Sequence, residues 1–175
     1  FTKMSGAGND FVVIDNRNNI ITDGALLAKK LCDRRWGIGA DGLLLIEKSE
    51  KAHYRMMYYN ADGSYGGMCG NGGRCVALYS AQNGIAPRKQ AFEALDHVYK
   101  AVVMNTQVIL QMKDPKNIIS NIVLPIGRKR IRASFIDTGS PHVVLLAKSL
   151  ANRKTNFECL PVERIGRVIR NHKRF

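Results

Sequence analysis

The segment CGNGGRC at residues 69–75 constrains this 175-residue chain more than any other feature, because it places a thiol on a glycine-rich turn. An apolar-periodic run, VALYSA at residues 76–81, follows directly, so the turn is predicted to open a helix. Backbone N–H groups and the positive end of a helix dipole stabilise a thiolate at such a place. The same N–H groups can hold a carboxylate. The segment therefore offers a base, Cys69, beside an anchor for an acidic ligand.

A structural role for the two cysteines of this segment is the main alternative. If a helix starts near Gly70, six residues at ~1.5 Å each separate Cys69 from Cys75 by roughly 9 Å. A disulfide requires Cα atoms within about 7 Å of each other, so no Cys69–Cys75 disulfide is predicted. The spacing Cys-x5-Cys is also a poor match to a zinc site, so no metal is predicted. For Cys69, the alternative that it is a buried cysteine without a catalytic role, on a plain glycine-rich turn, stays open. Cys75 is predicted to be a small core residue.

A second polar segment, NADGS at residues 60–64, lies just upstream of the thiol. It ends the strand predicted over residues 53–59 with an Asx-type turn, and the short gap to Cys69 lets Asn60 and the thiol meet across one cleft. The combined pattern N-x-DGS-x4-CGNG-x-R resembles the signature of the diaminopimelate epimerase family. Its many fixed positions make the pattern highly specific.

Three further segments resemble the same family in the expected order. They are FTKMSGAGNDF at residues 1–11, RRWGIGADG at residues 34–42 and DTGSPH at residues 137–142. The resemblance therefore runs over most of the chain.

The resemblance implies a reaction and a set of residues. Members of the family invert the α-carbon of a diaminodicarboxylic acid without pyridoxal phosphate or metal, using two cysteines on opposite faces of that carbon, so no cofactor is expected. Cys69 would be one of the pair, acting as general acid and base. The amides of Gly70 and Asn71 would hold the α-carboxylate. Asn9 and Asn60 match side chains that contact the substrate.

A histidine completes the residues that the resemblance assigns. His142 follows a Gly-Ser-Pro turn, from which it could hydrogen-bond Cys69 and stabilise the thiolate, as in a Cys–His pair. Taken without the resemblance, His142 would more often be a structural histidine, and Asn9 and Asn60 would more often be turn formers.

The chain departs from the family pattern at three places. Ser140 stands where many members have an asparagine that reaches the distal end of the substrate, and Gly42 stands where some have a glutamine that contacts it. The second cysteine motif, Ala-Cys-Gly-Thr-Gly, does not occur in these residues. Cys32 lies on an amphipathic stretch and is predicted to be buried, and Cys159 has no glycine-rich turn beside it. We expect the 175 residues alone to be inactive, as the front portion of an epimerase.

The order of predicted elements indicates an α+β protein. A helix capped by Thr22 is predicted to run to about Arg35, and a helix over residues 71–83 to stop at Gly84. Strands are predicted over residues 11–15, 43–48, 53–59, 92–95, 99–104, 108–112, 118–124, 131–137 and 142–147, followed by a basic helix over residues 164–174.

The resemblance turns this order into an architecture. It implies two similar lobes, each a curved, mostly antiparallel or mixed sheet wrapped around a central helix. With Asp114-Pro115 as the boundary, residues 1–114 would form the N-terminal lobe with the first catalytic cysteine, and residues 115–175 the beginning of a truncated second lobe.

Composition bears on partners and location. A net charge of +13 invites a nucleic-acid reading, and residues 113–175 hold 14 Lys/Arg against 4 Asp/Glu. However, the basic residues at 128–132 precede a predicted strand and those at 164–174 form one face of an amphipathic helix. No apolar run approaches the ~18 residues needed to span a bilayer. We therefore expect a cytoplasmic enzyme with a small-molecule substrate and no nucleic-acid or membrane partner; a homodimer is compatible with this reading.

Two other functions remain as alternatives at this point. One is a related cofactor-independent amino-acid racemase, because recognition of the distal substrate end is the least secure part of the resemblance. The other, from a different class, is a non-catalytic basic nucleic-acid-binding module. Sequence-dependent oligonucleotide binding at nanomolar concentration in a salt titration would favour the module.

Overall fold

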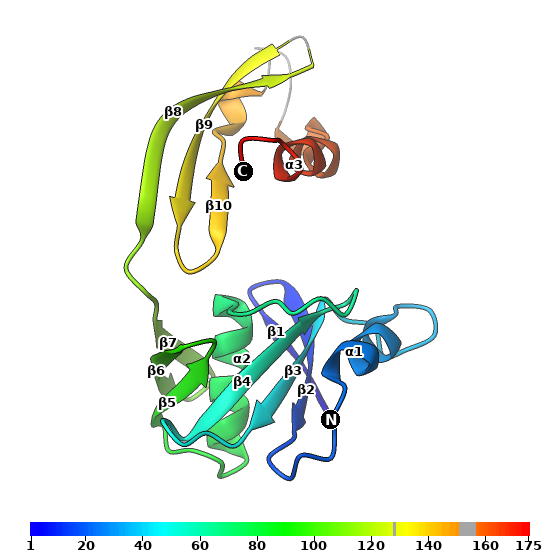
Figure 1. Ribbon diagram of the computed structural model, residues 1–175, viewed down its shortest axis with the longest axis vertical. Helices are drawn as coiled ribbons and strands as arrows, with labels where there is room; N and C mark the ends of the chain where they lie inside the picture. The colour runs from blue at the N-terminus through cyan, green and yellow to red at the C-terminus, as the bar shows by residue number, and fades with distance from the viewer. Residues whose placement is uncertain (128, 151–156) are drawn as a thin grey trace. The chain divides into compact units, whose positions relative to one another are not determined.

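The computed structural model describes residues 1–127, 129–150 and 157–175. The chain divides into two compact units, Phe1–Met112 and Lys113–Phe175. Figure 1 shows the elements of each unit.

The first unit is built on a seven-stranded mixed sheet whose strands follow one another in chain order. The strands are β1 (Thr2–Gly6), β2 (Asn9–Asp15), β3 (Gly42–Glu47), β4 (Tyr54–Asn60), β5 (Lys89–Ala94), β6 (His97–Met104) and β7 (Gln107–Gln111). The pairs β2/β3 and β4/β5 are parallel and the other pairs are antiparallel. The parallel pairs occur where a helix or a long loop carries the chain back along the sheet.

Two helices cover opposite faces of this sheet. Helix α2 (Gly70–Gln82) lies against the face around which the sheet curls, and α1 (Gly24–Cys32) packs on the other face (Figure 1). The predicted α+β architecture, a curved mixed sheet wrapped around a central helix, is thereby confirmed for this unit.

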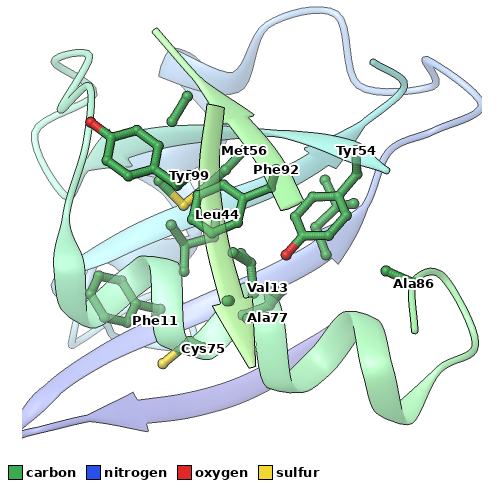
Figure 2. Close-up of a cluster of buried hydrophobic side chains, with 14 of the residues drawn as sticks. Phe11, Val13, Leu44, Tyr54, Met56, Cys75, Ala77, Ala86, Phe92 and Tyr99 are labelled. Carbon is green, nitrogen blue, oxygen red and sulfur yellow. The ribbon is translucent and has the colours of Figure 1, made fainter. Parts of the chain in front are cut away.

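The central strands alternate side chains between two apolar cores. In β3, Leu44 and Ile46 pack with α2, whereas Leu43 and Leu45 pack with Ala28 of α1. All four leucine and isoleucine side chains are at most 1% exposed, as expected of a strand buried on both faces. The core beside α2 is the larger one, and it includes the stacked rings of Tyr54, Phe92 and Tyr99 (Figure 2).

The first helix differs in its bounds from the prediction. Its N-cap is Asp23, not Thr22, and the Asp23 carboxylate accepts a hydrogen bond from the amide of Leu26 at 2.8 Å. The helix ends at Cys32, three residues before Arg35, because the side chain of Asp33 accepts from the amides of Arg35 and Trp36 and starts a turn. Both differences come from aspartates, which satisfy local backbone N–H groups better than their neighbours do.

The second unit is a three-stranded antiparallel sheet with a helix. Its elements are β8 (Lys116–Ile126), β9 (Lys129–Asp137), β10 (Pro141–Val144), the 3-10 turns Ala147–Ser149 and Phe157–Cys159, and α3 (Val162–Arg170). An apolar cluster of Ile122, Leu124, Ala133 and Ile169 joins the sheet to α3. The strand predicted to reach residue 147 ends at Val144, and the basic helix spans fewer residues than predicted.

Some sequence features lie outside the described residues, namely Arg128 of the first basic cluster and Asn156 beside Cys159. Among the residues that are described, no helix combines the length and the apolar character needed to cross a bilayer.

Candidate active site

Cys69 is the N-cap residue of α2, as the glycine-rich segment predicts. Its backbone is extended, with φ −129° and ψ 121°, and its Sγ accepts a hydrogen bond from the amide of Gly72 at 3.5 Å. The side chain is half-buried. The amides of the first helical turn have no acceptor within the helix, so those of Gly70 and Asn71 stand beside the sulfur as donors. This is the local geometry in which a thiolate and a carboxylate are both stabilised.

The pleat of the sheet gathers three predicted site residues on the face that carries α2. Phe11 pairs with Gly42, and Gly42 pairs with Asn60, so β2, β3 and β4 are level at this point. Side chains two residues apart share a face. Asn9 therefore shares the face of Phe11, and Asn60 that of Tyr58, and both Phe11 and Tyr58 pack in the core beside α2.

A direct contact joins Asn9 to the helix that carries the thiol. The side-chain amide of Asn71 donates to Oδ1 of Asn9 at 2.5 Å, and Arg74 donates to Oδ1 of Asn71. Asn9 in turn donates through Nδ2 to Asp41 at 3.0 Å. Because a carboxylate only accepts, Asp41 fixes which end of the Asn9 amide faces which partner.

A cluster of ion pairs holds Asp41, and through it Asn9, in place; this cluster was not predicted from the sequence. Arg34 contacts Asp10 at 2.8 Å and Asp41 at 2.9 Å, and Lys3 lies 3.2 Å from Asp10. The hydrogen bond from Arg34 holds the pKa of Asp10 far below its usual range, with Lys3 and the Asp41 amide acting in the same direction against a desolvation effect. These charged residues lie in the two glycine-rich segments 1–11 and 34–42. The presence of both segments was the only sign in the sequence that these charges could meet.

The Asp10 cluster makes a pH-dependent contribution to stability. Because folding lowers the pKa of Asp10, its contribution is complete above the ordinary aspartate pKa of about 3.9 and is lost as the pH falls below that value. Asp10→Asn cannot titrate. We expect the variant to be less stable than the wild type at pH 6 in urea denaturation, and the difference to shrink at pH 3. A difference that stayed constant between these pH values would contradict this account of the cluster.

Asn60 ends β4 and begins the predicted turn. The Gly63 amide donates to its carbonyl at 2.9 Å, and the side chain of Asp62 accepts from the Ser64 amide at 2.8 Å. The side chain of Asn60 accepts from the Tyr58 hydroxyl at 2.6 Å and donates to Oγ of Ser64 at 3.0 Å. Tyr58 was missed at the sequence level, although its position two residues before Asn60 on a strand puts it on the same face.

The remaining cysteines are distinct from Cys69. Cys32 and Cys75 are 2% and 3% exposed, as predicted for core residues, and Cys159 is exposed. Burial raises the pKa of both Cys32 and Cys75 to about 11. The described cysteines are all free thiols. In the described parts of the chain, no group of three or more His, Cys, Asp or Glu side chains is placed to bind a metal.

These differences predict an order of thiol reactivity. Since the thiolate is the nucleophile, the raised pKa and burial should protect Cys32 and Cys75 from alkylation at pH 8. We expect iodoacetamide to modify Cys69 and Cys159 at least about tenfold faster, measured by peptide mass spectrometry of the folded protein. Unfolding in urea should make all four react alike. Equal labelling of Cys75 and Cys69 in the folded protein would be incompatible with the site described above.

Two predicted site residues belong to the second unit. The carbonyl of Ser140 accepts from the Thr138 amide at 3.1 Å in the turn before β10, and His142 is an exposed residue of β10 that pairs with Ile136 of β9. Cys69, Gly70, Asn71, Asn9, Gly42 and Asn60 all lie in the first unit. The Cys–His pair predicted from the sequence stays a prediction.

The curved sheet around a central helix is shared with amino-acid racemases and epimerases of known structure. A probable proline racemase from Agrobacterium radiobacter K84 superposes with a TM-score of 0.67 at 13% identity, covering 85% of this chain and 52% of that one. A hydroxyproline epimerase from Agrobacterium vitis gives a TM-score of 0.62 at 14% identity, covering 85% and 51%. At such low identity the likeness defines the fold class.

Sequence comparison defines the family. Residues 1–115 match the family model described as diaminopimelate epimerase. The diaminopimelate epimerase of Flavobacterium psychrophilum is 43% identical over 154 residues, which are 86% of this chain and 56% of that protein. That of Carboxydothermus hydrogenoformans is 38% identical over 191 residues, 100% of this chain and 67% of the relative. The chain belongs to the diaminopimelate epimerase family, and it spans just over half to two thirds of the length of these relatives.

Proposed function

We propose that the protein inverts the α-carbon of diaminopimelate and interconverts the L,L and meso forms. The observation that carries the proposal is Cys69 at the N-cap of α2, with the first-turn amides beside it and Asn9 and Asn60 on the adjoining sheet face. Membership of the diaminopimelate epimerase family supports the choice of substrate. The proposed pathway role is the formation of lysine and peptidoglycan precursors.

The proposed reaction needs a base on each face of the carbon. A base that removed and returned the proton on one face would regenerate the starting isomer. The Cys69 thiolate takes the α-proton from one isomer, leaving a carbanion, and a second thiol donates a proton from the opposite face. In the reverse direction the two thiols exchange roles. The family resemblance implies that the second thiol belongs to the motif Ala-Cys-Gly-Thr-Gly, which these 175 residues do not contain.

The start of α2 supplies the electrostatic part of the mechanism. When the α-proton leaves, negative charge spreads from the carbon into the α-carboxylate. The Gly70 and Asn71 amides, with the positive end of the helix dipole, are proposed to hold that carboxylate and to stabilise the charge as it develops. The Asn71 backbone is held through its side-chain bond to Asn9, so the donors are already aligned before the substrate binds.

The proposal is tested by hydrogen exchange at the substrate carbon. The full-length protein is incubated with L,L-diaminopimelate in deuterium oxide, and the products are analysed by NMR and chiral chromatography. The meso isomer should appear with one solvent deuterium at the inverted carbon. Failure to form it, with proline or another amino acid racemised instead, would favour the related cofactor-independent racemase, the second candidate that the fold supports.

Several finer features belong to the same proposal. The catalytic set is Cys69 with His142, and the substrate-binding set is Asn9, Gly42, Asn60, Gly70, Asn71 and Ser140. Residues 1–114 would form the first lobe and 115–175 the beginning of the second. The enzyme would use no cofactor and would act on a small molecule in the cytoplasm. It would have no nucleic-acid or membrane partner, and a homodimer is compatible with the proposal.

A further inference from the structure

Tyr58 lies in a slot between two glycines. A Cβ atom on Gly42 would be 2.5 Å from Cε2 of Tyr58, and one on Gly66 would be 2.3 Å from both Cδ1 and Cε1. These are shorter than any contact that a real Cβ atom makes, so the ring occupies volume that side chains at both positions would need. An edge-to-face contact with Phe11, with centroids 5.9 Å apart, supports the ring further.

The position of the Tyr58 ring explains why residue 42 is a glycine in this chain. It was singled out above because some family members carry a glutamine there. In this chain the ring of Tyr58 fills the space beside β3 that a residue 42 side chain would enter, and the carbonyl oxygen of Tyr59 lies 2.6 Å from the same Cβ position. The polar group that Tyr58 brings to this part of the site is its hydroxyl.

The hydroxyl belongs to a hydrogen-bond chain with a fixed direction. Asp62 is a carboxylate whose pKa is lowered by its bonds from Ser64, so it only accepts. Ser64 therefore donates its hydroxyl proton to Asp62, at 2.5 Å, and accepts at the same oxygen from Nδ2 of Asn60, at 3.0 Å. This places Oδ1 of Asn60 toward Tyr58, whose hydroxyl donates to it at 2.6 Å.

Among the described residues, this hydrogen-bond chain leaves one donor on Asn60 for a ligand. An amide nitrogen carries two hydrogens, and Ser64 takes one of them. With both ends of the amide fixed, the second hydrogen has a defined direction. Asn9 is held in the same manner, between the donor Asn71 and the carboxylate of Asp41, so the two asparagines have matching supports.

Tyr58 is also close enough to the thiol to respond to its charge. Burial, and next the negative charge of a Cys69 thiolate, raise the pKa of Tyr58 to about 12. The hydroxyl thus keeps its proton over the working pH range and remains a donor to Asn60. Tyr58 and Cys69 both border the core beside α2.

We propose that Tyr58 is a positioning residue of the active site: clamped between Gly42 and Gly66, it orients Asn60 so that the free amide hydrogen meets an acceptor oxygen of the substrate, such as a carboxylate. This inference rests on the proposed function for its substrate. The orientation of Asn60 itself is a property of the folded chain.

The first test is kinetic and uses the full-length protein. Tyr58→Phe keeps the ring and removes the donor, so kcat/KM should fall about tenfold, mainly through KM. Tyr59→Phe is the matched control, because Tyr59 points to the opposite face of β4 and packs toward α1; it should change kcat/KM less than twofold. In an Asn60→Ala background, Tyr58→Phe should have almost no further effect. An equal loss in both backgrounds would overturn the positioning role.

The second test needs no activity, so it separates this inference from the proposed function. Tyr58→Phe and Asn60→Ala should be non-additive in the unfolding equilibrium constant of the full-length protein, with a several-fold coupling. Gly66→Ala should lower the melting temperature in the wild type and be tolerated once Tyr58→Ala has emptied the slot. Additive effects in the first pair, or equal cost of Gly66→Ala in both backgrounds, would refute the clamp. Absence of epimerisation with coupling intact would refute the substrate alone.

Discussion

Replacing Cys69 by alanine is expected to abolish interconversion of L,L- and meso-diaminopimelate in the full-length protein. General acid–base catalysis by one positioned group contributes about 10²- to 10⁴-fold, and inversion needs this thiol on its own face of the carbon, so the rate should fall by at least about 10³-fold. Chiral chromatography of the product measures the loss. The fold should survive, because Cys69 is half-buried and contributes one weak N–H to sulfur contact.

A matched variant separates the role of Cys69 from a general effect of removing a thiol. Cys159→Ala removes an exposed cysteine of the second unit and should leave the rate within about twofold of the wild type, as most surface substitutions do. Retained turnover by Cys69→Ala would disprove the assignment of this sulfur. Loss of turnover in both variants would attribute the effect to something other than the start of α2.

The second large effect is expected from Gly6→Ala, which adds one methyl group where β1 packs against the start of α2. The new Cβ would lie 2.7 Å from the carbonyl oxygen of Asn71 and 3.0 Å from Sγ of Cys75. The Asn71 atom is backbone, so the helix start must move. We expect the free energy of unfolding to fall by about 1–3 kcal/mol, as in overpacked cores. A displacement of the donors should lower kcat/KM by about 10²-fold.

A control for Gly6→Ala is available in α3. The same change at Gly166 meets no atom of the described residues within 4 Å and lies inside a helix, where alanine is favoured by about 1 kcal/mol. Thermal denaturation and kinetics of both variants check the prediction. If Gly6→Ala kept wild-type kcat/KM, the position of the Asn71 amide would not matter for the reaction, contrary to the mechanism proposed here.

Much of the first unit could be predicted from local sequence. The glycines after Cys69 and the apolar period that follows place the helix start to within one residue, at 71 where the structure has Gly70, because a cap and a buried face are both local properties. Residues 43–46 are less informative, because they are all apolar and both faces of β3 are buried. The sequence therefore does not show which side chains face α1 and which face α2. The α1 cap was wrong by one residue because Thr22 and Asp23 both favour that position.

The supports of the site could not be predicted in this way. The bond between Asn71 and Asn9 joins residues 62 positions apart, and the Arg34 pairs depend on how two loops meet. Such contacts follow from strand register, which a single sequence does not specify across parallel pairs. Tyr58 was within reach of the pattern, since strand alternation puts it beside Asn60, but its glycine slot depends on tertiary packing.

The most direct measurement is the rate at which iodoacetamide modifies Cys69 in the full-length protein, with and without diaminopimelate. We predict that saturating substrate slows modification of Cys69 at least about tenfold, because bound substrate would cover the thiol at the start of α2. Modification of Cys159, an exposed thiol with no role in the proposed reaction, should be unchanged. Peptide mass spectrometry reads both sites in one sample. Modification of Cys69 at the same rate in the presence and absence of substrate, under conditions of active turnover, would contradict the central claim.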